Sequence, residues 1–138
     1  MLETYSQNIT VQQNVAIPFN NVSIQKGCTA SKTAPNTIEL NKCGVYMVEF
    51  DGVASVTGTT AGNIVVQMSK NDTLQPQALT ANTSTGSTDV EAISFTTLVQ
   101  VSENNSCRCC DSPTVLKFVN TGVAATFVQA NVVVTKIC

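Results

Sequence analysis

The sequence contains no histidine and no tryptophan, and its 138 residues carry little charge. Without an imidazole base, nucleophilic catalysis by a Ser-His or Cys-His pair is excluded. The seven basic and nine acidic residues give a formal net charge of −2, and the basic ones are scattered along the chain. A nucleic-acid-binding surface needs clustered lysine and arginine, so we expect no nucleic-acid partner and no enzyme of the common histidine-dependent kinds.

Two further features that are absent concern membranes and export. No apolar run is long enough to cross a bilayer as a helix, so we expect no membrane segment. The first residues, Met1–Thr4, lack the basic and apolar regions of a signal peptide. We therefore expect synthesis in a host cytoplasm without export by that route.

What replaces charge is threonine, asparagine, serine, glutamine and valine, a mixture that favours strands and polar loops over helices. Hydrophobic residues make up 43% of the chain, so it is not disordered. Its length predicts one domain, covering residues 1–138.

The clearest strand signal lies at residues 43–56, where β-branched and aromatic residues nearly alternate with others and a glycine stands near each border. Glu49 and Asp51 interrupt the apolar positions, so one face is expected to meet water. We expect this segment to be a central strand. Other expected strands are 9–19, 22–24, 37–40, 63–70, 75–78, 90–101, 114–119 and 125–137.

Polar and turn-forming residues separate these segments. Loops are expected at 31–36, 80–88 and 102–113, a turn at Asn71-Asp72, and a hairpin at 120–122. Roughly eight strands with regular turns and no helix predict an all-β sandwich or barrel.

The pattern Gly44-x-Tyr46-x-Val48-x-Phe50, followed by the final-strand pattern Phe127-x-Gln129-x-Asn131-x-Val133, resembles the jelly-roll head of tumour-necrosis-factor-like and complement-type globular domains. That resemblance implies a jelly-roll β-sandwich that forms a homotrimer. Nearly the whole chain is also similar to small structural proteins of phages and prophages of Gram-positive bacteria. The segments that carry this second likeness are 16–22, 40–46, 94–101 and 134–138.

The resemblance implies a non-enzymatic protein of the virion: a capsid decoration protein or a short head or tail fibre whose partners are itself and capsid or tail proteins. The segment 1–13 would attach the trimer to its platform. Two alternatives remain open: a receptor- or carbohydrate-binding head at a tail tip that contacts a host surface glycan, and a spore- or cell-surface interaction domain. No catalytic residue follows from the resemblance.

Six cysteines are the most unusual feature of the composition. In a jelly roll we expect the last strand to run antiparallel to the 43–56 strand and to the 114–119 strand, which would bring Cys138 near Cys43 and near the 107–110 segment. Disulfides among the six, a zinc site and free thiols are all compatible with this cluster. C-x-C-C is not a zinc-ribbon spacing, and no other cofactor is expected. The disulfide candidates are Cys28, Cys43, Cys107, Cys109, Cys110 and Cys138, and the zinc candidates are the same set without Cys28.

Carboxylates and aromatic residues complete the candidates. Asp89 and Glu91 stand two apart and could share a strand face as a glycosidase pair, but solvated charges are the favoured interpretation for these and the other acidic residues. Phe19 and Tyr5 lie in the first edge segment, where they could insert into a neighbouring protomer. The remaining aromatic residues are expected in the core or at a trimer axis: Tyr46, Phe50, Phe95, Phe118 and Phe127.

Overall fold

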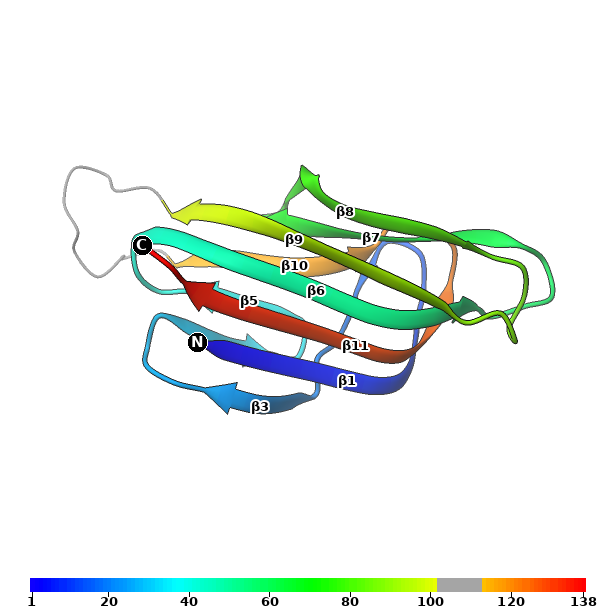
Figure 1. The fold of residues 1–138 in the computed structure, drawn as a ribbon, viewed down its shortest axis with the longest axis horizontal. Coiled ribbons are helices and arrows are strands. Elements are labelled where there is room, and N and C mark those ends of the chain that lie inside the picture. The colour runs from blue at the N-terminus through cyan, green and yellow to red at the C-terminus, as the bar shows by residue number, and fades with distance from the viewer. Residues whose placement is uncertain (102–112) are drawn as a thin grey trace.

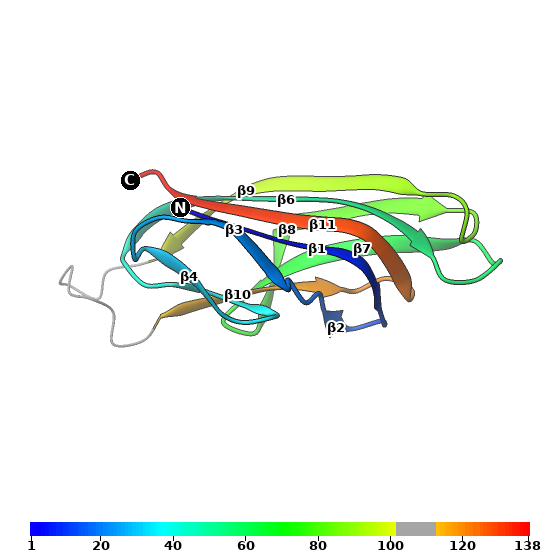
Figure 2. The same cartoon turned by 90° about the horizontal axis from the view of Figure 1, so that it is seen from below.

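The protein forms two antiparallel β-sheets that pack face to face as a jelly-roll sandwich (Figures 1 and 2). The computed structural model describes residues 1–101 and 113–138. The all-β expectation is confirmed, with eleven strands in the described residues in place of roughly eight. None of the described residues forms a helix that could cross a membrane.

The first sheet, called sheet A here, contains the strand predicted from residues 43–56. That strand is β6, and it lies inside the sheet between two antiparallel neighbours, as predicted for a central strand. In spatial order the strands of sheet A are β3 (Asn21–Gln25), β1 (Leu2–Val11), β11 (Ala125–Lys136), β6 (Gly44–Val56) and β9 (Glu91–Val101).

The second sheet, sheet B, covers the inner face of sheet A. A short strand, β2 (Val15–Ala16), pairs with one end of β10 beside the main path of this sheet. In spatial order the other strands of sheet B are β4 (Ala30–Ala34), β5 (Thr37–Leu40), β10 (Thr114–Asn120), β7 (Gly62–Lys70) and β8 (Thr73–Ser84).

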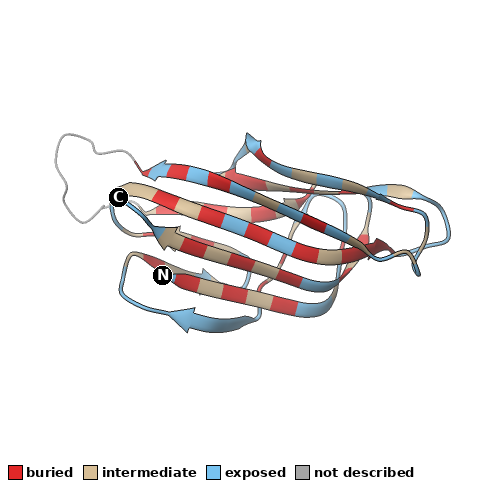
Figure 3. Ribbon diagram, viewed as in Figure 1, coloured by how far each residue is buried: buried red, intermediate tan, exposed pale blue. Residues whose placement is uncertain are grey.

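Alternating burial along β6 places the core between the sheets (Figure 3). Val48 and Phe50 are buried, whereas Glu49 and Asp51 face the solvent. The ring of Phe50 stacks on Phe95 of β9 at 5.6 Å between ring centroids and on Phe118 of β10 at 5.8 Å. Aromatic packing therefore joins the two sheets, and the core assignment of the aromatic residues is confirmed.

Phe19 was predicted to be available to a neighbouring protomer, and this prediction is wrong. Its side chain is only 1% exposed, and its ring packs edge-on against Phe118 at 5.8 Å. The backbone N–H of Phe19 donates to the carbonyl of Pro35, which draws the segment after β2 over the core. Tyr5, by contrast, remains partly exposed on sheet A.

The first strand starts earlier than the sequence indicates. β1 begins at Leu2 and pairs with β3 on one side and β11 on the other. Its inward positions include Thr4 and Ser6, whose hydroxyls donate to the carbonyls of Asn21 and Pro18, both at 2.6 Å. Inward polar residues whose hydroxyls bond to backbone carbonyls interrupt the apolar alternation that identifies a strand. Most of the segment 1–13 is thus part of the domain, and an attachment role for it stays a prediction.

Two segments expected to be loops contain strands. β4 occupies most of 31–36, and β8 extends through residue 84 into the segment 80–88. Both are outermost strands of sheet B. Edge strands commonly carry polar residues, so composition alone misidentifies them as loops.

The expected hairpin at 120–122 is wrong, because the chain there crosses from β10 in sheet B to β11 in sheet A. Asn120 is fully buried and controls the crossing: its side-chain amide donates to the carbonyls of Val11 and Val123 at 3.0 and 2.9 Å. Its side-chain oxygen accepts the N–H of Gly122. β11 therefore has β1 and β6 as neighbours, and the predicted pairing with 114–119 does not occur.

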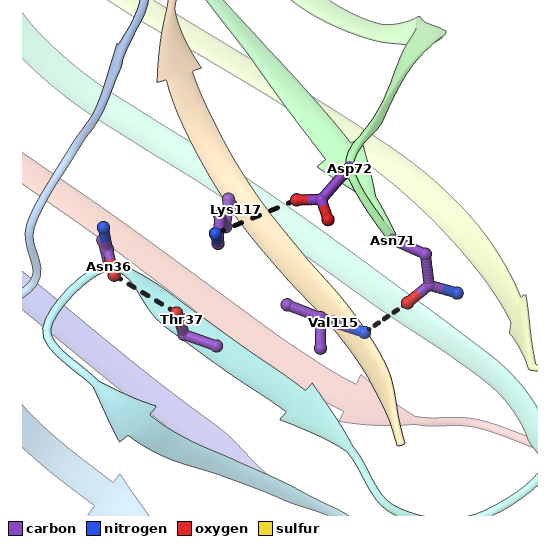
Figure 4. Close-up of polar contacts among 6 residues, drawn as sticks. All are labelled: Asn36, Thr37, Asn71, Asp72, Val115 and Lys117. Atoms are coloured by element: carbon purple, nitrogen blue, oxygen red, sulfur yellow. Dashed lines mark hydrogen bonds and ion pairs between the residues drawn. The ribbon is translucent and has the colours of Figure 1, made fainter. Parts of the chain in front are cut away.

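The predicted turn at Asn71-Asp72 is confirmed as the tight connection between β7 and β8 (Figure 4). Both residues have positive φ, 50° and 66°, which asparagine and aspartate tolerate better than most residues. The Asn71 side-chain oxygen accepts the N–H of Val115 at 2.9 Å, and Asp72 lies 3.9 Å from the ammonium group of Lys117. This turn thereby ties the β7–β8 hairpin to β10.

Candidate interaction surfaces

The outer face of sheet A is the face turned away from sheet B, and its side chains follow from the strand register. Tyr5 of β1 lies opposite Asn131 of β11, Asn131 lies opposite Asp51 of β6, and Asp51 lies opposite Ser94 of β9. One polar row therefore crosses four strands of this face. Directly opposed residues in an antiparallel sheet are close enough for their side chains to interact.

Apolar side chains lie on the same outer face, toward the end where β6 begins. Met47 pairs with Leu98, and the N–H of Ile137 donates to the carbonyl of Val45 at 2.9 Å. Leu98 is 58% exposed and Ile137 is 52% exposed. We call Val45, Met47, Leu98 and Ile137 the outer strip. Contiguous exposed apolar side chains of this kind mark contact surfaces.

Asn131 at the middle of the polar row has an unsatisfied group. Its side-chain oxygen is buried and accepts no hydrogen bond from the described residues. Leaving a buried acceptor without a donor costs about 1–3 kcal/mol.

The charge on the outer face has one sign. Its outward rows carry Glu3, Glu49 and Asp51, and within the described strands those rows contain no lysine or arginine. Glu3 and Glu49 both lie opposite Val133. Any molecule that covers this face must accommodate these carboxylates or pay for their mutual repulsion.

Asp89 precedes β9, so it does not share a face of that strand with Glu91, although the two carboxyls interact. The pKa of Glu91 is raised because its carboxyl shares a hydrogen bond with Asp89 and then feels the charge of that group. The pKa of Asp89 is lowered because Thr85 donates its backbone N–H at 2.8 Å and its hydroxyl at 3.0 Å. Glycosidase carboxyls lie about 5–9.5 Å apart to hold the sugar or a water, so this hydrogen-bonded, partly exposed pair is too close.

The remaining acidic residues do not gather. Asp72 precedes β8 and Asp89 follows it, so the two lie at opposite ends of that twelve-residue strand. Glu49 and Asp51 are exposed on β6. Within residues 1–101 and 113–138, no group of three or more cysteine, aspartate or glutamate side chains could hold a metal ion.

Three of the six cysteines fall in the described residues, and all three carry free thiols there. Cys43 is half-buried, while Cys28 and Cys138 are exposed. Cys138 lies beside the start of β6, since its carbonyl accepts the N–H of Val45 at 3.2 Å. The predicted zinc and disulfide roles of Cys107, Cys109 and Cys110 lie outside the described residues. Cys138 was predicted to lie near Cys43, and its contact with Val45, two residues further on, is consistent with that prediction.

A cleft of about 400 Å³ opens at an edge of the sandwich, between the end of β1, the β2 segment and the β4–β5 turn. Its apolar wall includes Val11, Val15, Pro18 and Pro35. No titratable side chain lines it. The cleft therefore offers shape and apolar contact without groups for acid–base chemistry.

Comparison with known proteins shows the fold. No protein-family model and no curated protein matches the sequence. Among solved structures, the PRD1 vertex protein P5 superposes with a TM-score of 0.60 at 16% identity, covering 99% of this chain and 96% of that one.

Tumour-necrosis-factor proteins superpose comparably. The Eiger TNF of S. frugiperda gives a TM-score of 0.63 at 11% identity, over 99% of this chain and 92% of that one. Rabbit GITRL gives 0.56 at 9% identity, over 100% and 95%. The chain thus has a TNF-like jelly-roll fold, as its resemblance implied, while a phage origin and a Gram-positive host stay predictions.

Proposed function

We propose that the protein is a non-enzymatic structural component of a virus particle, which self-associates as a homotrimer and decorates the capsid or forms a short head or tail fibre. The observation that carries the proposal is the near full-length superposition on a viral vertex protein. The exposed apolar side chains on the outer face of sheet A support it. The fold is shared with TNF proteins, so the fold alone does not select the viral role.

The outer face supports self-association through two of its features. The outer strip exposes Leu98 and Ile137 at more than half of their surface, and covering such side chains contributes about 25 cal/mol per Å² of apolar area buried. The polar row adds hydrogen-bonding groups on the same face, because Tyr5, Asp51 and Ser94 lie in line across it. A second copy is the occupant that a closed homo-oligomer provides.

Like charges on the same face oppose the association of copies. Copies that meet there bring Glu49 and Asp51 of each chain toward one another, and unpaired like charges oppose association. Screening by salt reduces this repulsion over distances longer than about 8–10 Å. The trimer is therefore expected to tighten with ionic strength, which is opposite to an association driven by surface ion pairs.

The virion role is tested by locating the protein on particles. A tagged chain is expressed during particle assembly, the particles are purified on a density gradient, and the tag is labelled for electron microscopy. Label at regular positions on the capsid or on a fibre supports the proposal. Label that stays with the soluble fraction, or on host cell envelopes, contradicts it.

Leu98→Glu is the test variant in the same experiment, and Val15→Glu is its control. It places a charge in the outer strip, so a trimer-dependent attachment should lose its label. Val15→Glu changes a similarly exposed side chain, 47% against 58%, on sheet B. It should leave the labelling unchanged.

A further inference from the structure

We propose that Cys43 and Cys138 form a disulfide that ties the C-terminal end of β11 to the start of β6 once the protein meets an oxidising environment. The inference depends on the backbone geometry at the end of the sandwich where both ends of the chain lie (Figure 1). It does not depend on the proposed virion role.

Cys138 is held in place before any disulfide forms. The N–H groups of Ile137 and Cys138 both donate to the carbonyl of Val45, at 2.9 and 3.3 Å, and the N–H of Val45 donates back to the carbonyl of Cys138 at 3.2 Å. Two residues that follow β11 thus oppose one residue of β6, which resembles the arrangement of a β-bulge. The backbone of Cys138 is therefore fixed against the first residues of β6.

Gly44 permits an unusually close approach between the two segments. Its φ is +138°, and a Cβ atom at this position would collide with the carbonyl oxygen of Cys138 and with the side chain of Lys136. The residue next to Cys43 in the sequence is therefore in direct contact with Cys138. Adjacent α-carbons are about 3.8 Å apart, so the backbone of Cys43 lies within one residue of this contact with Cys138.

The other partner is also anchored. The hydroxyl of Tyr46 donates to the carbonyl of Lys42 at 2.7 Å and approaches the carbonyl of Thr29 at 3.2 Å, and Tyr46 is fully buried. The turn that carries Cys43 is thus fixed to the core. Little backbone freedom remains to be lost when the two sulfur atoms join, which favours the bond.

Cys28 lies at the same end but has a different relation to Cys43. Its carbonyl accepts the side-chain amide of Asn41 at 3.3 Å, and its own side chain is exposed in the β3–β4 connection. Cys28 contacts Asn41, two positions before Cys43, whereas Cys138 contacts Gly44, the residue that follows Cys43. We therefore assign Cys138 as the partner, and Cys28 serves as an internal control.

The reaction needs an oxidant, for which a small-molecule disulfide such as glutathione disulfide is sufficient. The exposed Cys138 thiolate attacks one sulfur of that disulfide, forms a mixed disulfide and releases one glutathione thiolate. The Cys43 thiolate then attacks the Cys138 sulfur and releases the second glutathione. Two protein thiols lose two protons and two electrons, and one glutathione disulfide is reduced to two glutathione molecules.

Tryptic peptide mapping tests the proposal on the intact chain. The protein is incubated with glutathione disulfide, its remaining thiols are alkylated, and it is digested without reduction. Trypsin separates the three described cysteines into the peptides 27–32, 43–70 and 137–138. We expect 43–70 joined to 137–138, with Cys28 not joined to either.

Two variants sharpen the result. Cys28→Ser should leave the linked peptide unchanged, and Gly44→Ala should slow its formation because the new methyl group displaces the carbonyl of Cys138. Recovery of Cys43 or Cys138 as alkylated peptides, or either one joined to a different cysteine, would overturn the assignment.

Discussion

Replacing Phe50 by alanine tests whether the register of β6 places that ring between the two sheets. Phe50 is 1% exposed, and its ring stacks on Phe95 of the same sheet and on Phe118 of the opposite sheet. Phe→Ala at a buried site costs about 3–5 kcal/mol, and the stacked pairs place this site toward the upper end of that range.

The change is measured by urea denaturation at one fixed protein concentration, since self-association makes the apparent stability depend on concentration. With a urea dependence of about 2 kcal/mol per M, the transition midpoint should fall by about 1.5–2.5 M. Glu39→Ala, at an outward position of β5 in sheet B, should change the free energy of unfolding by less than about 0.5 kcal/mol. A loss below about 1 kcal/mol for Phe50→Ala would mean that the register is shifted by one residue, which exchanges the inner and outer faces.

Three further predictions follow from polar groups. Glu91→Gln should raise the thermal unfolding temperature at pH 7 and leave it unchanged at pH 3. The raised pKa of Glu91 means that the folded chain holds this proton more tightly than the unfolded chain does. The stability that the proton contributes is therefore present at low pH and is lost as the pH rises through the raised pKa. An equal change at both pH values would contradict the shared proton. Asn71→Val should lower the free energy of unfolding by about 2–3 kcal/mol, through strain at positive φ and loss of the hydrogen bond to Val115. Asn71→Gly loses the hydrogen bond without the strain and should cost only about 1 kcal/mol. Equal losses for the two variants in chemical denaturation would refute the strain argument. Glu49→Gln should lower the dissociation constant of the trimer, as added salt should, and weaker association in the variant would show that Glu49 is paired across the interface.

The strands that could be predicted from the sequence are those whose inward positions carry a run of apolar residues. β6, β7, β9, β10 and β11 all follow from alternating β-branched and aromatic residues. The first half of β1 could not be predicted in this way, because Thr4 and Ser6 occupy inward positions and donate their hydroxyls to nearby carbonyls. β4 was missed because it is a polar edge strand of sheet B. The hairpin expected at Asn120 failed for a related reason: the same residues that make a tight turn also make a crossing between sheets, and only the burial of Asn120 distinguishes the two.

The candidate surface was visible in part from the sequence. Val45 and Met47 give β6 apolar residues on both of its faces, which indicates a second surface that avoids water. The expectation that one face of β6 meets water left this signal unused. Leu98 could not be assigned an outward position without the pairing of β9 with β6. The unsatisfied oxygen of Asn131 depends on side-chain packing across three strands, which no pattern of residues along one strand contains.

Sedimentation equilibrium of the purified chain tests the central claim, that this jelly roll assembles as a homotrimer through the outer face of sheet A. The account predicts a species of three times the 14.6 kDa chain mass at micromolar concentration, its dissociation to monomer by Leu98→Glu, and no change with Val15→Glu. A clean monomer in the unaltered protein, or a trimer that Leu98→Glu leaves intact while Val15→Glu disrupts it, would contradict the claim.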